Sequence, residues 1–285
     1  MTIEDGYWNV VPDASGPVIV SLGTNPGGGT LSGTPSALVT NGRGVFPNLS
    51  VDKAGVGYTL VASATTCSGC GGNWPSPRPS GAISTAFTIV PGPVATVRVN
   101  PSAAALNFVS GPNSVQLVAT PVDAFGNATV GSATWSSGGP AATVSSTGLV
   151  TGVGGIATIT ASSGGRTGTA TVVTQCGPPR CSVPGFGILQ PGTARAGDAL
   201  PPVQAGFSCA FGCGTSSTWT VSLLLGNNPG GATLTGNSDK QASFYSETVT
   251  WSNLRIDKPG TYTLVAIVSG TDILGATSGS FTITP

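Results

Sequence analysis

The chain has 285 residues, enough for two or three domains, and only 7% of them are charged, with ten basic side chains balancing ten acidic ones. Ordinary soluble domains carry about 25% charged residues, so this chain lacks the basic surface that binding to nucleic acid requires. Histidine is absent, which excludes Ser-His-Asp and Cys-His catalysis, and the acidic residues show no paired spacing suited to glycoside hydrolysis. We therefore expect no enzymatic activity, no cofactor and no nucleic-acid partner.

The composition and patterning of the chain predict an all-β fold. Glycine contributes 44 residues, and Val and Thr dominate the runs between the glycines. Apolar and polar residues alternate in stretches such as VRVN at 97–100 and TWTVS at 218–222, whereas no helical periodicity persists without a Gly or Pro. No run of 18 apolar residues occurs, so we expect no membrane-spanning segment.

Two stretches of the sequence occur twice. Residues 21–33 (SLGTNPGGGTLSG) correspond to 224–236 (LLGNNPGGATLTG), and residues 48–62 (NLSVDKAGVGYTLVA) correspond to 253–266 (NLRIDKPGTYTLVA). An internal repeat of this kind indicates that the chain is built of modules.

The repeat and the segment between its copies predict three modules, at residues 1–91, 94–174 and 188–285. Short linkers that contain proline separate them. The first module shows short strands and turn clusters at the spacing that is typical of a β-sandwich. Its strands are expected at residues 7–11, 18–22, 37–39, 44–47, 57–62 and 86–90.

An insertion distinguishes the first module from its second copy. Between residues 58 and 87 the offset to the second copy falls from 204 to 194, so the first module has ten extra residues there. The segment contains Cys67, Cys70, Trp74 and Arg78. Loops at the ends of a sandwich often carry binding residues, so Trp74 and Arg78 form a candidate partner-binding loop. The alternative is that Trp74 packs under its own loop.

The middle module contains a recognisable series of stretches. They are VATPVDAFGN (118–127), ATWSS (133–137), ATVSSTGLVTGV (142–153) and ATITA (157–161). In this order they resemble the bacterial immunoglobulin-like domain, group 2. In a sandwich of this kind we expect Trp135 in the core, and Gly148 and Gly152 at turns that need a positive φ.

The outer modules are similar to immunoglobulin-like repeats of bacterial surface proteins, through their GTNPGGGTLSG and DKxGxYTLxA kinds of stretch. Together the resemblances imply three tandem immunoglobulin-like β-sandwich domains in an elongated array, with no catalysis attached.

We expect the first strand of the first module to be missing. The third module opens with residues 188–207, and the first module has no counterpart before its own first strand. A sandwich without this strand exposes an unpaired sheet edge, which a strand from elsewhere can fill. We expect head-to-tail self-association, with a linker segment or the C-terminal strand of a neighbour as donor. The candidate donor residues are Phe281, Thr282, Ile283 and Thr284.

Six cysteines form three pairs of closely spaced residues. The pairs are Cys67 with Cys70, Cys176 with Cys181, and Cys209 with Cys213. Such pairs are typical of disulfides in an oxidising compartment, so we expect an extracellular or cell-surface protein. Zinc is the alternative, but the spacings differ and histidine is absent. A thioredoxin-type redox site needs a strand-to-helix junction, which this chain lacks.

Asp52 and Asp257 recur before the glycine-containing turn of both repeat copies. We expect each to form an Asx turn with its own backbone. Calcium binding is the alternative, but calcium needs six or more oxygen ligands, and few acidic residues cluster here.

These expectations combine into one hypothesis and one alternative. The hypothesis is a non-enzymatic extracellular structural protein, a stalk or a self-assembling filament subunit. The alternative is an adhesin segment that binds a glycan or a protein through residues 67–78.

Overall fold

The computed structural model describes most of the chain. The described residues are 1–5, 7–64, 82–107, 112–174, 185–189, 191–208, 219–242, 248–269 and 274–285. They form 29 β-strands and no helix, so the prediction of an all-β fold is confirmed. The same residues therefore contain no helix that could cross a membrane. The chain folds into two compact units, one of residues 1–93 with 123–128 and one of residues 94–122 with 129–285.

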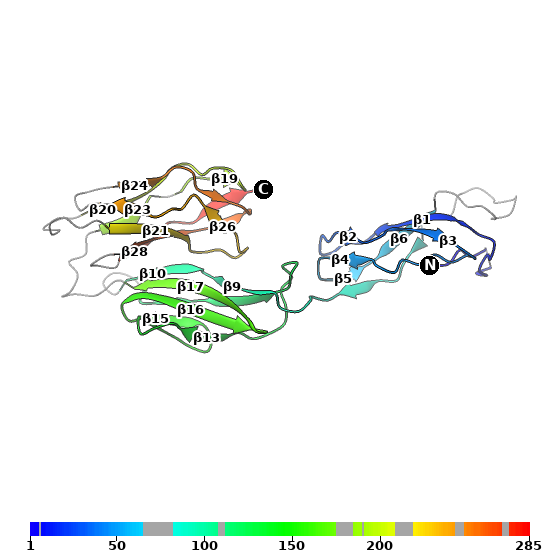
Figure 1. Ribbon diagram of the computed structural model, residues 1–285, viewed down its shortest axis with the longest axis horizontal. Helices are drawn as coiled ribbons and strands as arrows, with labels where there is room; N and C mark the ends of the chain where they lie inside the picture. The colour runs from blue at the N-terminus through cyan, green and yellow to red at the C-terminus, as the bar shows by residue number, and fades with distance from the viewer. Residues whose placement is uncertain are drawn as a thin grey trace. The chain divides into compact units, whose positions relative to one another are not determined.

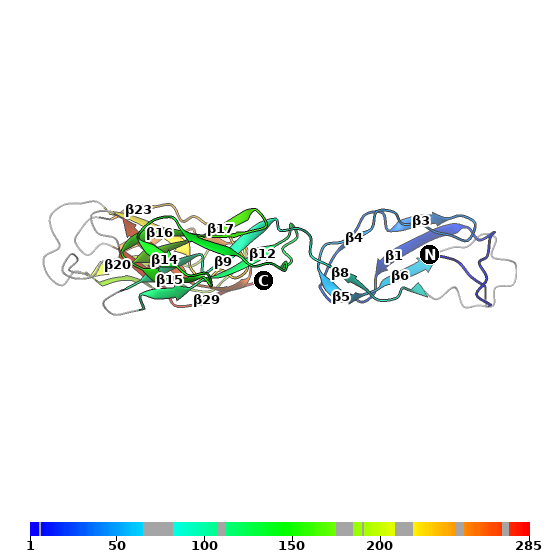
Figure 2. The ribbon, with the colours of Figure 1, turned by 90° about the horizontal axis from the view of Figure 1, so that it is seen from below.

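Module one is built on a four-stranded antiparallel sheet with the order β3-β1-β6-β7, and two strand pairs, β2-β4 and β5-β8, complete it (Figure 2). Its strands are β1 (Gly16–Leu22), β2 (Leu31–Ser32), β3 (Ser36–Val39), β4 (Ser50–Val51), β5 (Gly55–Tyr58), β6 (Leu60–Ala64), β7 (Ala82–Ile83) and β8 (Phe87–Ile89). Along β1 the side chains of Val18 and Val20 are buried, whereas Ile19 between them is exposed. Successive side chains of a β-strand point to opposite faces of the sheet, so Val18 and Val20 lie on the inner face and Ile19 on the outer one.

Two strands expected in module one are absent from the described residues. At 7–11 the carboxylate of Asp5 accepts hydrogen bonds of 2.9 Å from the backbone N–H groups of Tyr7 and Asn9, and Trp8 has a φ of 69°. At 44–47 no strand forms, and a turn with positive φ at Asn41 precedes this segment. The prediction was wrong at both places, because left-handed residues and bonds from side chain to backbone end the extended conformation that alternation suggests.

Module two is a sandwich of the sheet β10-β17-β16-β13 with the sheet β11-β15-β14 and the pair β12-β9. Its strands are β9 (Thr96–Asn100), β10 (Ala103–Leu106), β11 (Ser114–Gln116), β12 (Val118–Val122), β13 (Thr134–Ser137), β14 (Ala142–Val144), β15 (Leu149–Gly152), β16 (Gly155–Ser163) and β17 (Arg166–Thr174). The strand β10 runs parallel to β17, and all other strand pairs of the module are antiparallel.

The core of module two contains the expected tryptophan at its margin. Trp135 on β13 is partly buried and packs against the buried cluster around Leu117 and Ile159. Gly148 has a φ of 85°, as expected, and an added Cβ there would lie 2.8 Å from the Trp135 ring. Gly152 instead lies within β15, and a Cβ there would overlap the side chain of Thr174. Its small size serves close packing and not a positive φ.

Module three contains the second copy of the repeat and an additional three-stranded sheet, β18-β20-β24. Its other sheets have the orders β23-β21-β27-β28, β19-β29-β26 and β22-β25. Its strands are β18 (Gly185–Ile188), β19 (Ala194–Arg195), β20 (Val203–Ser208), β21 (Trp219–Leu225), β22 (Leu234–Thr235), β23 (Lys240–Ala242), β24 (Thr248–Trp251), β25 (Arg255–Ile256), β26 (Gly260–Tyr262), β27 (Leu264–Ser269), β28 (Leu274–Thr277) and β29 (Phe281–Thr284).

Modules two and three lie side by side within one compact unit, where β28 lies next to β10 and β17, and β27 next to β10 (Figure 1). An apolar cluster joins the two facing sheets. It comprises Ala103, Ala105, Val173, Leu224, Val265 and Ile267. Gly275 on β28 permits this close approach, since an added Cβ would overlap the side chains of Val173 and Ala105.

Polar contacts extend the same interface. The backbone N–H of Ser102 donates to the carbonyl of Gly226 at 2.8 Å, and its hydroxyl donates to the carbonyl of Leu225 at 2.8 Å. The amide of Asn100 donates to the side-chain oxygen of Asn227 at 3.0 Å. An elongated array was expected for all three modules, but modules two and three instead pack face to face. The difference arises because the outward face of β27 is apolar and needs a covering surface.

Candidate functional site

The repeated sequence stretches build the same corner in both outer modules. In module one the side chain of Asn25 bridges its loop, accepting from the backbone N–H of Gly29 and donating to its carbonyl, both at 2.8 Å. Asp52 accepts a hydrogen bond of 2.6 Å from the backbone N–H of Thr30. The hydroxyl of Tyr58 donates to the carbonyl of Lys53 at 2.9 Å. A tyrosine that bonds back to its own preceding turn is a feature of immunoglobulin-like sandwiches.

Module three repeats each of these contacts. Asn228 bridges to Ala232, and Asp257 accepts from the N–H of Thr233 at 2.7 Å. The hydroxyl of Tyr262 donates to a carbonyl four residues earlier, at 3.0 Å. The two aspartates therefore tie one loop to another instead of forming Asx turns with their own backbone. Within the described residues no group of three or more His, Cys, Asp or Glu side chains is placed to hold a metal ion.

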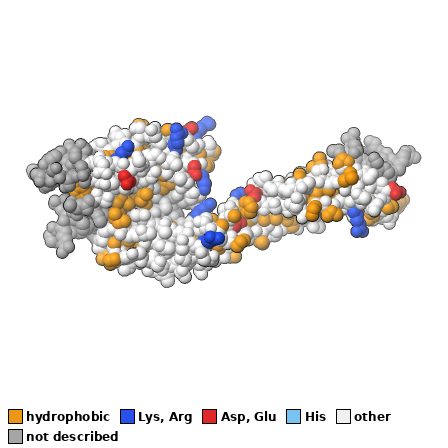
Figure 3. Space-filling view, in the orientation of Figure 1, with side chains coloured by type: hydrophobic (Ala, Val, Ile, Leu, Met, Phe, Trp, Pro, Cys, Tyr) orange, Lys and Arg blue, Asp and Glu red, His pale blue; other side chains and the backbone are white. Residues whose placement is uncertain are grey.

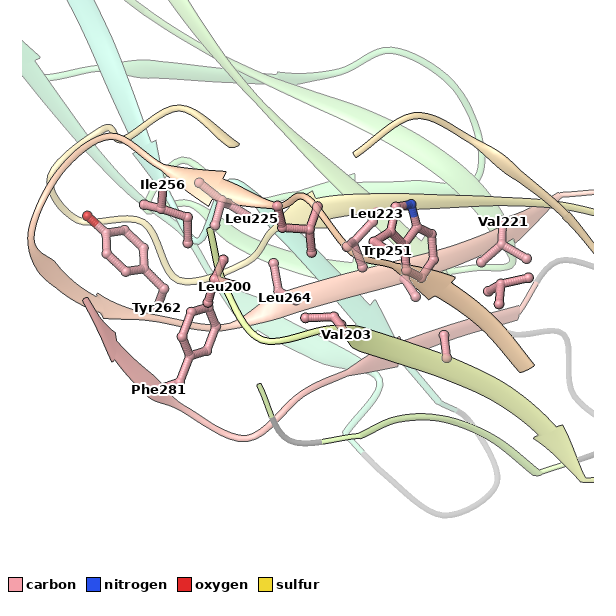
Figure 4. Packing of buried hydrophobic residues seen from close by; sticks show 14 of the residues in the cluster. Leu200, Val203, Val221, Leu223, Leu225, Trp251, Ile256, Tyr262, Leu264 and Phe281 are labelled. Carbon is pink, nitrogen blue, oxygen red and sulfur yellow. The ribbon is translucent and has the colours of Figure 1, made fainter. Parts of the chain in front are cut away.

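The inner face of module three is closed by residues 194–205, which comprise β19, the loop after it and the start of β20. Leu200, Val203 and Ala205 are at most 3% exposed and belong to the core cluster of this module. Figure 4 shows Leu200 and Val203 directed at the side chains of Leu264 and its neighbours on the repeat sheet. In the pairing of β20 with β24, Val203 lies opposite Trp251, which is 1% exposed.

The backbone of this segment is bonded along its length. Ala196 donates its N–H to the carbonyl of Thr284 at 2.9 Å, and β19 runs parallel to β29. Gly197 donates to the carbonyl of Ile256, and Leu200 to that of Leu254, both at 2.8 Å. These bonds and the apolar side chains together hold the segment across the open end of the sandwich.

Module one has no such segment in its described residues. At the start of this module Met1 bonds Gly44 through both backbone groups, and Thr2 bridges to Arg43. By the repeat, Gly44 corresponds to Val249, so Met1 holds the place of Ala205. The places of Val203, Leu200 and β19 have no counterpart in this part of the structure.

The corresponding inner face of module one is less buried. Its residues are partly exposed where their counterparts in module three are buried. The pairs are Phe46 and Trp251, Leu49 and Leu254, Val51 and Ile256, Leu60 and Leu264, Ala62 and Ala266, Phe87 and Phe281, and Ile89 and Ile283. The last strand, β8, pairs with β5 alone among the described strands. We call this region of module one the open side, defined by residues 44–51, 60–62 and 87–90.

The loop 123–128 belongs to the same compact unit as module one. Asp123 in this loop accepts hydrogen bonds of 2.9 Å from the backbone N–H groups of Gly92, Phe125 and Asn127 and from the Asn127 amide. Burial alone would raise the pKa of Asp123, but these hydrogen bonds lower it to about 2. Asn127 in turn donates to the carbonyl of Asp52 at 2.9 Å, so the VDxxGN stretch supports the turn of module one.

Several predicted site residues lie outside the described residues. They are Trp74, Arg78, Cys67, Cys70, Cys176, Cys181, Cys209 and Cys213. The candidate donor strand is described. Phe281 and Ile283 are buried, and β29 is paired on both edges, with β19 and β26. It already serves as a central strand of its own module.

Sequence reasoning missed the residues that close module three. It recognised residues 188–207 as an unmatched segment but did not assign Leu200, Val203 and Ala205 to the core. The alternation of Val203 and Ala205 about Gln204 was the available signal.

No protein-family model matches this chain, and no curated protein matches it. Among solved structures, domains 4–9 of the surface layer protein SbsC align with 98% of this chain and 42% of that chain, at 16% identity and a TM-score of 0.28. InvD of Yersinia pseudotuberculosis aligns with 100% of this chain and 92% of that chain, at 14% identity and a TM-score of 0.27. Mouse cadherin-23 EC22-24 aligns with 94% of this chain and 85% of that chain, at 19% identity and a TM-score of 0.27. At TM-scores this low, the likeness does not bear on function.

Proposed function

We propose that this chain is a non-enzymatic structural segment of the cell exterior, part of a stalk or a self-assembling filament built of immunoglobulin-like modules. Its middle module is proposed to be a bacterial immunoglobulin-like domain of group 2, on the stretches given above. The close spacing of the cysteines in three pairs supports an oxidising compartment outside the cytoplasm.

The observation that supports the structural role is the close packing of module two against module three. Their interface contains a buried apolar cluster and direct hydrogen bonds, and Gly275 brings the two sheets close together. Interfaces between domains that are large and apolar restrict relative motion. A rigid pair of modules suits a protein that maintains distance or transmits force. On the face shown in Figure 3 charged side chains are few and scattered, which lowers repulsion between copies.

Labelling of intact cells tests the location. An antibody raised against the full chain should label unpermeabilised cells that produce the protein, while an antibody against a cytoplasmic protein should not. Labelling that appears only after permeabilisation would overturn the proposal. Electron microscopy of the purified chain at high concentration then separates the two forms: filaments indicate an assembling subunit, and dispersed particles indicate a passive stalk.

The expected donor strand is a poor candidate for assembly. Donation of Phe281–Thr284 would require β29 to leave β19 and β26 and to expose two buried side chains. Such a loss is of the order of several kcal/mol. If copies assemble by strand donation, another segment supplies the strand.

A second candidate function, an adhesin segment that binds a glycan, is favoured by a different surface from residues 67–78. Tyr7 and Trp8 are 86% and 85% exposed at a turn that the Asp5 carboxylate holds together. Hydrogen bonds from the backbone of Asn9 and then of Tyr7 keep the pKa of Asp5 below its ordinary value. Exposed aromatic rings held on a fixed turn are suited to stacking on sugar rings.

Substitution of Trp8 tests this candidate. Trp8→Ala should abolish binding to a glycan array without changing the thermal midpoint, because the side chain is exposed. Binding that persists in Trp8→Ala would rule out this surface as the glycan site.

A further inference from the structure

We infer that the open side of module one is an acceptor site for an extended polypeptide segment, with the chemistry of residues 191–204 of the same chain. This inference deepens the proposed function, and it rests on that function only for its biological use. Module three serves as the model for the complex, because its own residues cover the inner face that is partly exposed in module one.

The site first requires a ligand with apolar side chains. In module three, Leu200 and Val203 cover the inner face, and Ala194 and Ala196 pack against its margin. The corresponding face in module one is made of Phe46, Val51, Leu60 and their neighbours, all apolar and partly exposed. A sheet face of this composition is unfavourable in water and is stabilised by apolar side chains laid across it.

The site also requires a ligand with a row of hydrogen-bond donors. In module three the carbonyl groups of Leu254, Ile256 and Thr284 accept from the N–H groups of the covering segment. By the repeat, Leu49, Val51 and Val90 hold these three positions in module one. A ligand that offers N–H groups in a row together with apolar side chains is an extended peptide, which is the partner that open sheet edges bind.

The third observation fixes the register. Met1 pairs with Gly44 as Ala205 pairs with Val249, so a peptide bound in the register of module three ends at the place of Gln204. The probe is therefore a peptide of residues 191–204, PGTARAGDALPPVQ. One contact is lost, because the guanidinium of Arg255, which donates to the carbonyl of Gly197 at 2.7 Å, is replaced by Ser50.

The test is a titration of this fluorescein-labelled peptide with the full 285-residue chain, followed by anisotropy. We expect saturable binding at one site. A control peptide with Leu200→Asp and Val203→Asp should bind at least about tenfold more weakly, because it would place unpaired charges on an apolar face. Hydrogen exchange on peptide addition should slow at residues 44–51 and 87–90. Equal binding of the two peptides, or protection elsewhere, would overturn the inference.

A pair of chain variants locates the site. Phe46→Asp should weaken peptide binding, whereas Leu38→Asp, on β3 outside the open side and 70% exposed, should leave binding unchanged. Equal effects of the two variants would contradict the assignment. Failure of peptide binding leaves the labelling of intact cells unaffected, so the two proposals fail separately.

Discussion

Modules one and three carry the same repeated stretches, yet they differ on both faces of the sheet that these stretches build. In module three, five of the six residues of β27 (LVAIVS) are buried, because residues 200–205 cover one face and module two covers the other. In module one the equivalent strand β6 (LVASA) is only partly buried. The comparison teaches that the repeat specifies a corner and a sheet, and that the flanking segments decide whether the sheet becomes a closed sandwich.

The outward positions show the same division. Leu224 and Ile267, which face module two, are replaced in module one by Ser21 and Ser63. Serines at these positions suit a face that stays in water, so module one is not built to dock in the way that module three does.

The largest effect should come from the core position that differs most between the modules. Trp251→Ala should lower the unfolding free energy of module three by about 3–5 kcal/mol, since the ring is buried and its Nε1 donates to the Ser238 carbonyl. The matched change Phe46→Ala should cost module one less than about 1.5 kcal/mol, because Phe46 is partly exposed. Denaturant titrations followed by hydrogen exchange in each module measure the two losses of unfolding free energy. Equal losses would mean that the open side is covered.

The next effect concerns the interface of modules two and three. Gly275→Val should destabilise this unit by about 1–3 kcal/mol, because the new side chain would overlap Val173 and Ala105. The wild-type unit should unfold in a single transition, and in Gly275→Val we expect this transition to separate into two. Gly139→Ala, at a position with no atom within 4 Å of an added Cβ, serves as the control. A single transition in Gly275→Val would show that the interface does not couple the two modules.

A pH effect should distinguish the unit of module one from module three. The pKa of Asp123 is lowered from 3.8 to about 2, so its stabilising contribution is complete above the pKa of the unfolded chain. It diminishes as the pH falls below about 4 and is lost as the pH falls through about 2, at most about 2.5 kcal/mol in all. Asp123→Asn should remove this acid sensitivity from residues 52–54, as followed by hydrogen exchange between pH 5 and pH 2. Unchanged acid sensitivity in the variant would assign it to another group.

The smallest effect should be equal in the two modules. Tyr58→Phe and Tyr262→Phe each remove one hydrogen bond, of 2.9 Å to Lys53 and 3.0 Å to Lys258, from a fully buried ring. Each should cost about 0.5–1.5 kcal/mol in thermal or denaturant unfolding. A clear difference between the two would show that the shared corner is not equally supported in both modules.

Much of the architecture follows from sequence pattern alone. The strand expected at residues 18–22 lies within β1, and Tyr58 and Tyr262, which recur in the two repeat copies, make equivalent hydrogen bonds. The turn at Tyr7 and Trp8 was predicted as a strand, because alternation does not reveal that the Asp5 carboxylate captures two backbone N–H groups.

The packing of modules two and three was not predicted, although a signal was present. The run LVAIV at residues 264–268 is apolar without interruption, which is typical of a strand buried on both faces. Its copy in module one, LVASA at residues 60–64, has lost this property. The partner of such a face is a matter of tertiary packing, since sequence shows that a strand needs cover but not what covers it.

The parallel pairing of the last strand in modules two and three has a mechanical consequence. In module two β10 runs parallel to β17, and in module three β19 runs parallel to β29. Tension that pulls the two strands of such a pair in opposite directions loads their hydrogen bonds in shear, so that these bonds resist together. In module one β8 is paired only with the antiparallel β5 among the described strands. It would peel away one bond at a time, so a tether containing this chain would extend first at module one and relieve the load on the other two.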